Sequence, residues 1–571
     1  MGGRRRARGA SSRMMATDRV RETYARILEV GRSEVWITLR PIEDVLVEAA
    51  AVDERTAAGE HLPLSGVTTA VKDNIDVAGL PTTAGCPAFA YDPPASAPVV
   101  ARLVAAGAVV LGKTNLDQFA TGLTGTRSPY GAVRDARRPG YVSGGSSSGS
   151  AVAVALGAAE IALGTDTAGS GRVPAAFQGI VGIKPTRGLA PTRGVVPACR
   201  TLDCVTVFAR ELTLAHRAMA QLTTPPGRPW AADAPLAAPP AAVVAVPKQL
   251  SGLSSAAAAA FAAAAGRLAG AGSELVEIDL EPFLAIGHLL YEGAFVAERY
   301  AAVGSFVDAH RDQVDPTVGS IIATAGGLPA HALVADGERL ERFRVSAEAE
   351  LTGAHALLLP TTTRQPTLLE VAGDPLALNG ELGTYSTFAN LLDMCAVAVP
   401  AGRADGGEFG VTLLGRAFAD RLVADLAAVL TGPTEPAGGP PGVDLFVVGA
   451  HRAGQPLNCQ LTARGARLSG TVSTSPEYRL HRLDAHPPKP GLVRVDDGGA
   501  SIEGELWRLP PAAVADFLAA LPAPMALGRV RLIDGTSPIG FLCEPAALAG
   551  TDDITEYGSW PMYLRSARVT P

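Results

Sequence analysis

The sequence predicts an α/β protein of two domains, a large α/β domain followed by a smaller α+β domain, and three observations support this. The chain has 571 residues, more than one ordinary domain contains. Hydrophobic residues make up 47% of it and charged residues 18%, a composition typical of globular proteins with large cores. Residues 431–443, TGPTEPAGGPPGV, are mostly proline or glycine and therefore predict a linker.

This linker sets the predicted domain boundaries. The first domain is expected over residues 17–430, closing with a helix over residues 420–430, and the second over residues 444–571. Residues 1–16 are basic and lack the apolar stretch of a secretory signal. We expect a mobile basic tail there, or a start site placed too early, before Met14 or Met15.

Charge and cysteine content narrow the functional classes. A net charge of −7 argues against a nucleic-acid partner, and no run of about 20 apolar residues predicts a membrane span. The cysteines show no disulfide-like framework and no CxxC pair for zinc, so reduced thiols, a cytoplasmic location and no metal are expected. They are Cys86, Cys199, Cys204, Cys395, Cys459 and Cys543.

A lysine follows the first apolar, β-branched run of the large domain. The run from Val67 to Val71 predicts a buried strand, and Lys72 comes directly after it. A lone lysine at a strand end is usually a solvated surface charge. Its neighbours along the chain are needed to decide whether it does chemistry.

Two Gly-rich loops with hydroxyl side chains follow. The first spans residues 144–150, GGSSSGS, and the second surrounds Ser170; the apolar run from Ala151 to Leu163 joins them and suits a buried helix or strand. A GGSSSGS run alone is more often a flexible linker. A linker does not usually lead into a core segment and a second such loop, so these loops are interpreted as parts of a site that uses backbone N–H donors.

Together the three pieces, VKDNIDV, GGSSSG and GTDTAGSGR, resemble the amidase signature family over roughly residues 49–415. That resemblance implies an α/β fold with a mixed central β-sheet flanked by helices, and a Lys-Ser-Ser triad. Carried over by motif, Lys72 is the general base, Ser146 the bridging serine and Ser170 the nucleophile. The resemblance also implies a cis peptide bond between Gly145 and Ser146.

The residue types suit hydrolysis of an amide. A hydroxyl must lose its proton as it attacks, and the leaving nitrogen must gain one. Burial disfavours the charged form of a lysine, so a desolvated Lys72 becomes a neutral base near pH 7. The family's oxyanion hole is implied to use the backbone N–H groups of Thr167, Ala168, Gly169 and Ser170.

Other residues of the two loops are interpreted as structural or as rivals. Asp166 and Arg172 flank the nucleophile at a spacing that suits bracing of the loop. Ser147 and Ser148 compete with Ser146 for the bridging role, but the family pattern places the bridge directly after the paired glycines.

Smaller features resemble the allophanate hydrolase branch of the family. They are the segments TDTAGSGRVPA and GKTNLDQFATGLTGTRSPYG, and a patch, LYEGAFVAERYAAV, similar to the branch's substrate-carboxylate clamp. In that patch Tyr291 and Arg299 are eight residues apart, which predicts one face of a helix, and arginine suits a carboxylate. The alternative is an amphipathic helix with a packed tyrosine and a solvated arginine.

The second domain resembles the C-terminal domain of many allophanate hydrolases, at its start, DLFVVGAHRAGQPLNCQL, and at its end, DITEYGSWPMYL. In that branch the domain is linked with decarboxylation of the first product. His451 and His481 are candidates by chemistry alone, and a structural role is the alternative for each. Cys459 stands where many relatives have another residue type.

The implied function is therefore hydrolysis of allophanate to ammonia and N-carboxycarbamate, which decarboxylates, in urea degradation. No metal or organic cofactor is implied, a biotin-dependent urea carboxylase is the implied functional partner, and homodimer formation is an expectation from the resemblance alone. The alternatives are a broad-specificity amidase, an amidotransferase glutaminase subunit, and an inactive scaffold of the same fold.

Overall fold

The structure is a computed structural model that describes residues 14–434 and 438–567. The predicted basic tail, 1–16, therefore lies almost wholly outside the described residues, as do residues 435–437 of the predicted linker. The chain divides into two compact units. The N-terminal unit comprises Met1–Arg228, Val243–Ala417 and Ala427–Gly438, and the C-terminal unit comprises Pro229–Ala242, Phe418–Leu426 and Gly439–Pro571.

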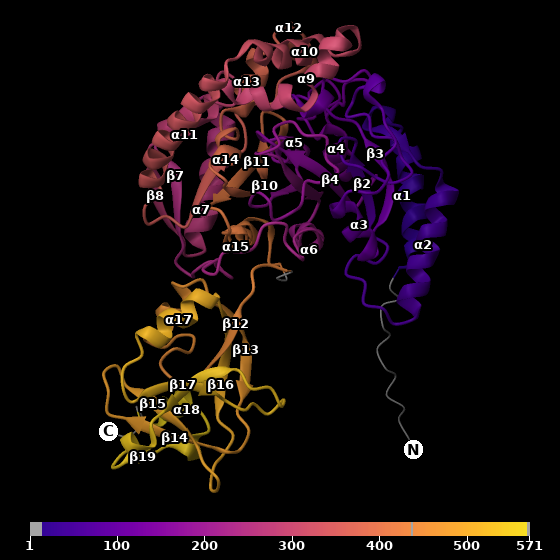
Figure 1. Cartoon of the computed structure of the whole chain (residues 1–571). Helices are drawn as coiled ribbons and strands as arrows, with labels where there is room; N and C mark the ends of the chain where they lie inside the picture. Colours follow the sequence, from indigo (N-terminus) through magenta and orange to yellow (C-terminus); the bar gives the residue numbers. More distant parts are fainter. Residues whose placement is uncertain (1–13, 435–437, 568–571) are drawn as a thin grey trace. The chain divides into compact units, whose positions relative to one another are not determined.

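An 11-stranded mixed sheet forms the centre of the N-terminal unit, as predicted (Figure 1). Its strand order is β1-β3-β2-β4-β6-β5-β10-β11-β9-β7-β8. The strands are β1 (Trp36–Leu39), β2 (Thr68–Lys72), β3 (Val109–Thr114), β4 (Ile161–Asp166), β5 (Val181–Lys184), β6 (Cys204–Ala209), β7 (Val243–Pro247), β8 (Glu274–Ile278), β9 (Ala356–Pro360), β10 (Cys395–Ala404) and β11 (Gly407–Gly415).

Helices flank this sheet. They are α1 (Ala16–Val30), α2 (Ile42–Ala57), α3 (Pro98–Ala105), α4 (Ser148–Leu156), α5 (Val173–Gln178), α6 (Leu212–Leu222), α7 (Ser255–Gly270), α8 (Glu281–His288), α9 (Ala297–Ala309), α10 (Pro316–Ala323), α11 (Ala330–Glu350), α12 (Leu368–Gly373), α13 (Ala377–Gly383), α14 (Phe388–Leu391) and α15 (Asp420–Thr431). Helix α7 packs on β8 to β11, and α4 packs on β2, β3, β4 and β6.

Parallel strands place the two Gly-rich loops at one edge of the sheet. Strand β2 pairs in parallel with β4, so Lys72 and Asp166, the last residues of these strands, lie at the same edge. Every residue of both strands is buried, which is typical of strands covered on both faces. The apolar run after Ser150 forms most of α4 and the start of β4, so it contributes both a helix and a strand.

The C-terminal unit is a smaller α+β structure. A five-stranded sheet has the order β13-β16-β12-β18-β17 and a three-stranded sheet the order β15-β14-β19. The elements are β12 (Val443–Val447), α16 (Asn458–Thr462), β13 (Arg467–Ser473), β14 (Tyr478–Leu483), β15 (Lys489–Arg494), β16 (Glu503–Leu509), α17 (Pro511–Ala519), β17 (Met525–Arg529), β18 (Ile539–Cys543), β19 (Asp552–Asp553) and α18 (Trp560–Ala567).

Two segments that precede the predicted linker belong to this C-terminal unit, and one of them contains the first part of α15, so that helix is divided between the two units. In residues 418–426, Asp425 accepts hydrogen bonds from Arg467 of β13 at 2.6 and 2.8 Å. In residues 229–242, the Ala232 carbonyl accepts from the Ala512 N–H at 3.0 Å. These pairings between distant segments are invisible in the linear sequence.

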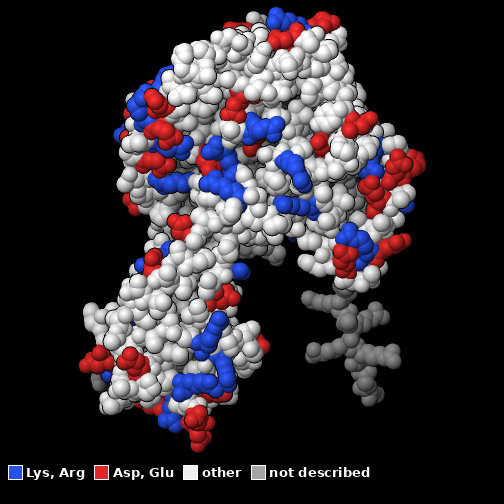
Figure 2. Space-filling view, viewed as in Figure 1, with Lys and Arg blue, Asp and Glu red and all other residues white. Residues whose placement is uncertain are grey.

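The structure shows where charged side chains and thiols lie among the described residues. Figure 2 shows both acidic and basic side chains on the visible face, with several basic ones gathered across the middle of the N-terminal unit. All six cysteines are free thiols, and Cys459 alone among them is exposed. Among the described residues no single helix is long and apolar enough to cross a membrane; the pair Pro316–Gly327 and Ala330–Glu350 meets that criterion only when combined across a 101° bend.

Strand β4 has no room for a side chain at Gly164. A Cβ built there would lie 2.6 Å from the Phe208 ring and 2.7 Å from Ser147 Oγ. We therefore expect Gly164→Ala to destabilise the protein by about 1–3 kcal/mol through overpacking. Gly266→Ala is the matched control, because Gly266 lies in α7 with open space around it. Alanine favours a helix over glycine, so this variant should raise the free energy of unfolding by about 0.5–1 kcal/mol. Urea unfolding of both variants checks this, and equal effects would contradict it.

Candidate active site

Lys72 ends strand β2 and is completely buried. Its Nζ contacts Ser146 Oγ at 2.8 Å and Thr165 Oγ1 at 2.7 Å. Burial lowers the pKa of this lysine from 10.5 to about 7, and the negative charges of Asp117 and two further buried aspartates partly oppose that effect. A large fraction of the Lys72 amine is therefore neutral at neutral pH.

Ser146 lies between Lys72 and Ser170. Its Oγ donates to Ser170 Oγ at 3.0 Å, so the structure brings the three predicted residues into one continuous chain of polar contacts. The peptide bond between Gly145 and Ser146 is cis, as the resemblance implied. Ser147 and Ser148 take no part in this chain, because their hydroxyls donate to the carbonyls of Thr165 and Asn115.

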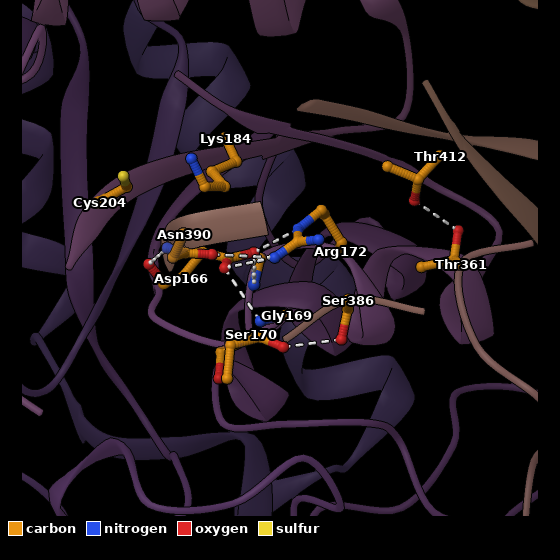
Figure 3. A network of polar contacts seen from close by, with 12 residues as sticks. Asp166, Gly169, Ser170, Arg172, Lys184, Cys204, Thr361, Ser386, Asn390 and Thr412 are labelled. Atoms are coloured by element: carbon orange, nitrogen blue, oxygen red, sulfur yellow. Dashed lines mark hydrogen bonds and ion pairs between the residues drawn. The ribbon is translucent and has the colours of Figure 1, made fainter. Parts of the chain in front are cut away.

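An ion pair braces the loop that carries Ser170. The Asp166 carboxylate accepts two hydrogen bonds from the Arg172 guanidinium, both at 2.9 Å, and two from the backbone N–H groups of Gly169 and Gly171, both at 3.0 Å. Figure 3 shows this carboxylate between the loop and the arginine. Asn390 ties the pair to a distant segment by accepting from Arg172 at 3.1 Å. The prediction that Asp166 and Arg172 brace the loop is confirmed.

The backbone N–H groups of this loop are divided between two uses. The Gly169 N–H donates to Asp166, so it is not available to a substrate oxygen in this structure, contrary to the expectation from the resemblance. Within residues 14–434, the N–H groups of Thr167, Ala168 and Ser170 donate to no protein acceptor. These three donors belong to the loop that carries Ser170 and are the ones left free to receive a developing oxyanion.

Asp203 holds the same loop from its other side, and sequence reasoning missed it. Its carboxylate accepts from the Thr167 hydroxyl and from the N–H groups of Ala198 at 3.0 Å and Cys199 at 3.2 Å. Burial raises the pKa of Asp203 to about 6. The signal available in the sequence was a lone acidic residue directly before the apolar run of β6.

Tyr291 and Arg299 meet, but not in the way the sequence predicted. Arg299 lies in α9, whereas Tyr291 lies in the turn after α8, so the prediction that both share one helix face is wrong. A turn with Gly293 separates the helices, and the chain folds back so that the Arg299 Nη2 donates to the Tyr291 hydroxyl at 3.0 Å. The guanidinium carbon also lies 4.9 Å from the tyrosine ring centroid, a cation–π distance.

The Arg299 side chain is buried without a carboxylate partner. It is 1% exposed, and its Nη1 donates to the Thr121 hydroxyl at 3.1 Å. None of the acidic groups in the described ranges lies within ion-pair distance of it, and its Nε has no hydrogen-bond partner there. A buried cation is costly unless an anion compensates it, so this arrangement suits a negatively charged ligand. The solvated arginine of the alternative interpretation does not describe it.

A cavity of about 610 Å³ reaches Tyr291. Its walls come from α8, from the end of α10 and from α13, and they include Thr387, Asn379 and Leu376. Apolar and polar side chains both line it, and the polar ones include the carboxylates of Glu292 and Glu381. It offers a small solute a route toward the Tyr291–Arg299 pair.

The C-terminal unit has a cavity of its own, of about 340 Å³, lined by His451. The imidazole stacks on Phe541 with ring centroids 4.8 Å apart, and its Nε2 contacts the Gln460 amide oxygen at 3.0 Å. Burial lowers the pKa of His451 below its usual value. Lys489 and Arg464 also line this cavity and give it positive charge.

The other candidate histidine, His481, lies on β14 and does not line that cavity. Its Nδ1 contacts the Thr551 hydroxyl at 3.3 Å. The structure therefore distinguishes two histidines that the sequence could not, and it assigns the cavity to His451.

Comparison with known proteins gives two family matches. Residues 18–424 match the family model described as amidase, and residues 443–565 match that of the allophanate hydrolase C-terminal domain. The solved structure of allophanate hydrolase from Kluyveromyces lactis is similar, with a TM-score of 0.88 and 37% identity over 97% of this chain and 98% of that one.

Two curated relatives extend the comparison. The urea amidolyase of Lachancea kluyveri is 42% identical over 93% of this chain, and this chain spans 31% of its length. A glutamyl-tRNA(Gln) amidotransferase subunit from Halobacterium salinarum is 33% identical over 64% of this chain and 95% of its own length.

The depressed pKa of Lys72 predicts a pH-dependent stability effect. The folded protein releases this proton near pH 7 but the unfolded chain keeps it to about 10.5, so unfolding takes up a proton between these values and stability rises with pH across that window. The Lys72→Met variant has no titrating group at this position. We expect its free energy of unfolding to exceed that of the wild type by more at about pH 6 than at about pH 9, as measured by urea unfolding. A difference independent of pH would contradict the assigned pKa.

Proposed function

The chain belongs to the amidase family, the amidase signature enzymes, and we propose that it is an allophanate hydrolase, which releases ammonia and N-carboxycarbamate from allophanate. The observation that carries this proposal is the buried Arg299, which has no carboxylate partner among the described residues and lies in the same unit as the Lys72–Ser146–Ser170 chain. Allophanate has both groups that such a site requires, a terminal amide and a carboxylate.

Acylation begins with proton transfer along the three side chains. The Ser170 hydroxyl attacks the amide carbon while Ser146 accepts its proton and passes its own to the neutral Lys72 amine. For this transfer the hydroxyl hydrogens turn to point toward Lys72, the reverse of the direction in which they donate in the structure. The contacts of 3.0 and 2.8 Å are within the range needed for such transfers. The same proton returns through Ser146 to the leaving nitrogen, so ammonia departs and an ester on Ser170 remains.

The negative charge of the tetrahedral intermediate falls on the former carbonyl oxygen. We assign its stabilisation to the N–H groups of Thr167, Ala168 and Ser170. Losing one donor of this kind typically costs about 100- to 1000-fold in rate. Water then attacks the ester, with Lys72 again as base, and releases N-carboxycarbamate.

Selection of the substrate rests on Arg299 and Tyr291. The planar guanidinium can hold a carboxylate by parallel hydrogen bonds, and the Tyr291 hydroxyl already fixes its orientation. Without an anionic substrate the guanidinium has no ion-pair partner among the described residues, and only the more distant carboxylate charges of Asp203 and Glu298 favour its protonated form, so neutral amides gain nothing from it. The clamp thereby favours allophanate over uncharged amides of the same size.

We assign the fate of N-carboxycarbamate to the cavity of the C-terminal unit. This product carries two carboxylates, and Lys489 and Arg464 supply positive charge to the cavity walls. Loss of carbon dioxide from it requires a proton on the nitrogen, and the neutral imidazole of His451 can relay one from water. The family match of residues 443–565 supports this assignment.

A urea carboxylase is the functional partner that fits this reaction, because carboxylation of urea produces allophanate. The similarity to urea amidolyases supports the link. Among the alternatives, the glutaminase subunit is disfavoured because its match leaves about a third of this chain uncovered and the C-terminal unit unexplained. A broad amidase stays the rival proposal and makes no use of Arg299.

Substrate charge should separate the two proposals. Biuret differs from allophanate in having an amide in place of the carboxylate. We expect Arg299→Gln to lower kcat/KM for allophanate by about 100-fold or more, the scale of a lost charge-assisted contact, and to change biuret consumption little. Ser170→Ala should abolish turnover of both substrates.

Arg416→Gln is the matched control for this test, because Arg416 is a half-exposed arginine paired with Glu348. It should leave both substrates unaffected. Equal losses for allophanate and biuret in the Arg299 variant would overturn the clamp and favour the broad amidase.

The role of His451 can be read from the product mixture. With carbon-13-labelled allophanate, we expect His451→Gln to accumulate N-carboxycarbamate while the first ammonia is released at the wild-type rate. His481→Gln is the control, since His481 lies outside the cavity. Carbon-13 NMR follows the labelled product. If N-carboxycarbamate accumulates in neither variant, the cavity has no role in its decarboxylation.

A further inference from the structure

The segment from Asp117 to Arg127, called here the 117–127 loop, contacts both halves of the site. One of its residues touches Arg299 of the proposed carboxylate clamp, and its backbone touches the Gly145–Ser146 segment of the proton relay. Its contacts indicate that it joins recognition of the substrate to the serine that moves its proton.

The clamp end of the loop is Thr121. Its hydroxyl accepts from Arg299 Nη1 at 3.1 Å and donates to the Phe119 carbonyl at 3.2 Å, so both of its roles are used. The Thr121 carbonyl accepts from Arg127 Nη1 at 3.1 Å. Thr121 is fully buried, so these contacts are shielded from water.

The serine end of the loop is made of backbone contacts. The Gly145 N–H donates to the Leu123 carbonyl at 2.8 Å, and the Asp117 N–H donates to the Ser146 carbonyl at 3.2 Å. The peptide that carries the bridging serine is therefore held on both sides by the loop.

Asp117 lies where the two ends meet. Its buried carboxylate accepts from the N–H groups of Gly125 at 3.0 Å and Arg127 at 3.0 Å, which closes the loop on itself. A Cβ built on Gly145 would lie 2.1 Å from Asp117 Oδ2, and one built on Gly122 would lie 2.7 Å from it. The carboxylate is thus packed directly against the backbone next to Ser146.

The loop's backbone is held in an unusual conformation. Phe119 and Ala120 have φ angles of 50° and 53°, which residues other than glycine rarely adopt. Such a conformation persists where surrounding contacts determine it, and here the Phe119 N–H donates to the Ala84 carbonyl at 2.9 Å. Asn379 accepts from the Leu123 N–H at 2.8 Å.

We propose that Asp117 is a positioning residue that holds the 117–127 loop so that Arg299 and Ser146 keep one fixed geometry, coupling recognition of the substrate carboxylate to the proton relay. This proposal rests on the proposed function. Asp117 acts through Thr121 on one side and through the Gly145–Ser146 backbone on the other, in addition to its charge, which partly opposes the lowered pKa of Lys72. A substrate carboxylate bound to Arg299 is thereby held at a fixed position relative to the nucleophile Ser170.

Two substitutions separate the two ends. Thr121→Val removes the hydroxyl at the clamp only, so kcat/KM for allophanate should fall by about tenfold, the scale of one hydrogen bond to a charged group, with biuret unchanged. Thr121→Ser keeps the hydroxyl and should restore most of that loss. Asp117→Asn disturbs both ends, so kcat should fall for both substrates and the ratio of allophanate to biuret kcat/KM should fall as well.

A double-variant cycle tests the coupling itself. If Asp117 acts on selectivity through Arg299, adding Arg299→Gln to Asp117→Asn should lower the allophanate-to-biuret ratio less than it does in the wild type. Additive effects would overturn the coupling.

Asp135→Asn is the matched structural control. Asp135 is also a buried carboxylate that accepts two backbone N–H groups, from Arg137 at 2.8 Å and Arg138 at 2.6 Å, but its loop contacts neither Arg299 nor Ser146. The proposal would be overturned if Asp117→Asn and Asp135→Asn lost similar thermal stability and each kept the wild-type ratio of allophanate to biuret kcat/KM. If Asp117→Asn does not fold, the Thr121→Val and Thr121→Ser pair decides the clamp end.

The wild-type ratio distinguishes failure of this proposal from failure of the proposed function. A wild type without preference for allophanate over biuret contradicts the function itself, and the coupling with it. A clear wild-type preference that none of the loop variants changes contradicts the coupling alone.

Discussion

The site depends on a lysine amine that is kept away from water. Lys72 is buried at the end of β2 with two hydroxyls as its hydrogen-bond partners, and burial brings its pKa to about 7. A solvated lysine would stay protonated and could not accept the proton of a serine. The parallel pairing of β2 with β4 brings this lysine and the nucleophile loop to one sheet edge, so the fold itself supplies the geometry of the relay.

Desolvation also requires that neighbouring charges be balanced. Asp166 is paired with Arg172 and hydrogen-bonded to the loop backbone, which is the condition under which a buried carboxylate is tolerated. Removing one partner of such a pair is typically costly because the other charge is left buried. Arg299 is the exception, since no carboxylate of the described residues lies within ion-pair distance of it, and this missing partner is what points to an anionic substrate.

Much of the fold and of the candidate site could be predicted from the sequence, because the residues that form each loop of the site are close together in the chain. The mixed sheet, the family and the amidohydrolase class were predicted correctly, and the resemblance to that family singled out Lys72, Ser146 and Ser170, which the structure brings into contact. Their catalytic roles stay predictions. Contacts between distant segments were beyond reach: the turn that brings Tyr291 to Arg299, and Asp203 behind Thr167. Nor could the sequence show that the Gly169 N–H is occupied, or choose between His451 and His481, because both depend on side-chain placement.

The most direct test of this account is the pH dependence of kcat/KM for a chemically stable anionic amide such as malonamate, checked for a rate-limiting chemical step by a solvent isotope effect. A neutral Lys72 base predicts that kcat/KM falls on the acid side with an apparent pKa of about 7, because protonation removes the acceptor for the serine proton. A profile that stays flat to about pH 5, or that still rises beyond about pH 9 as for an unperturbed lysine, would contradict the desolvated base on which the account depends.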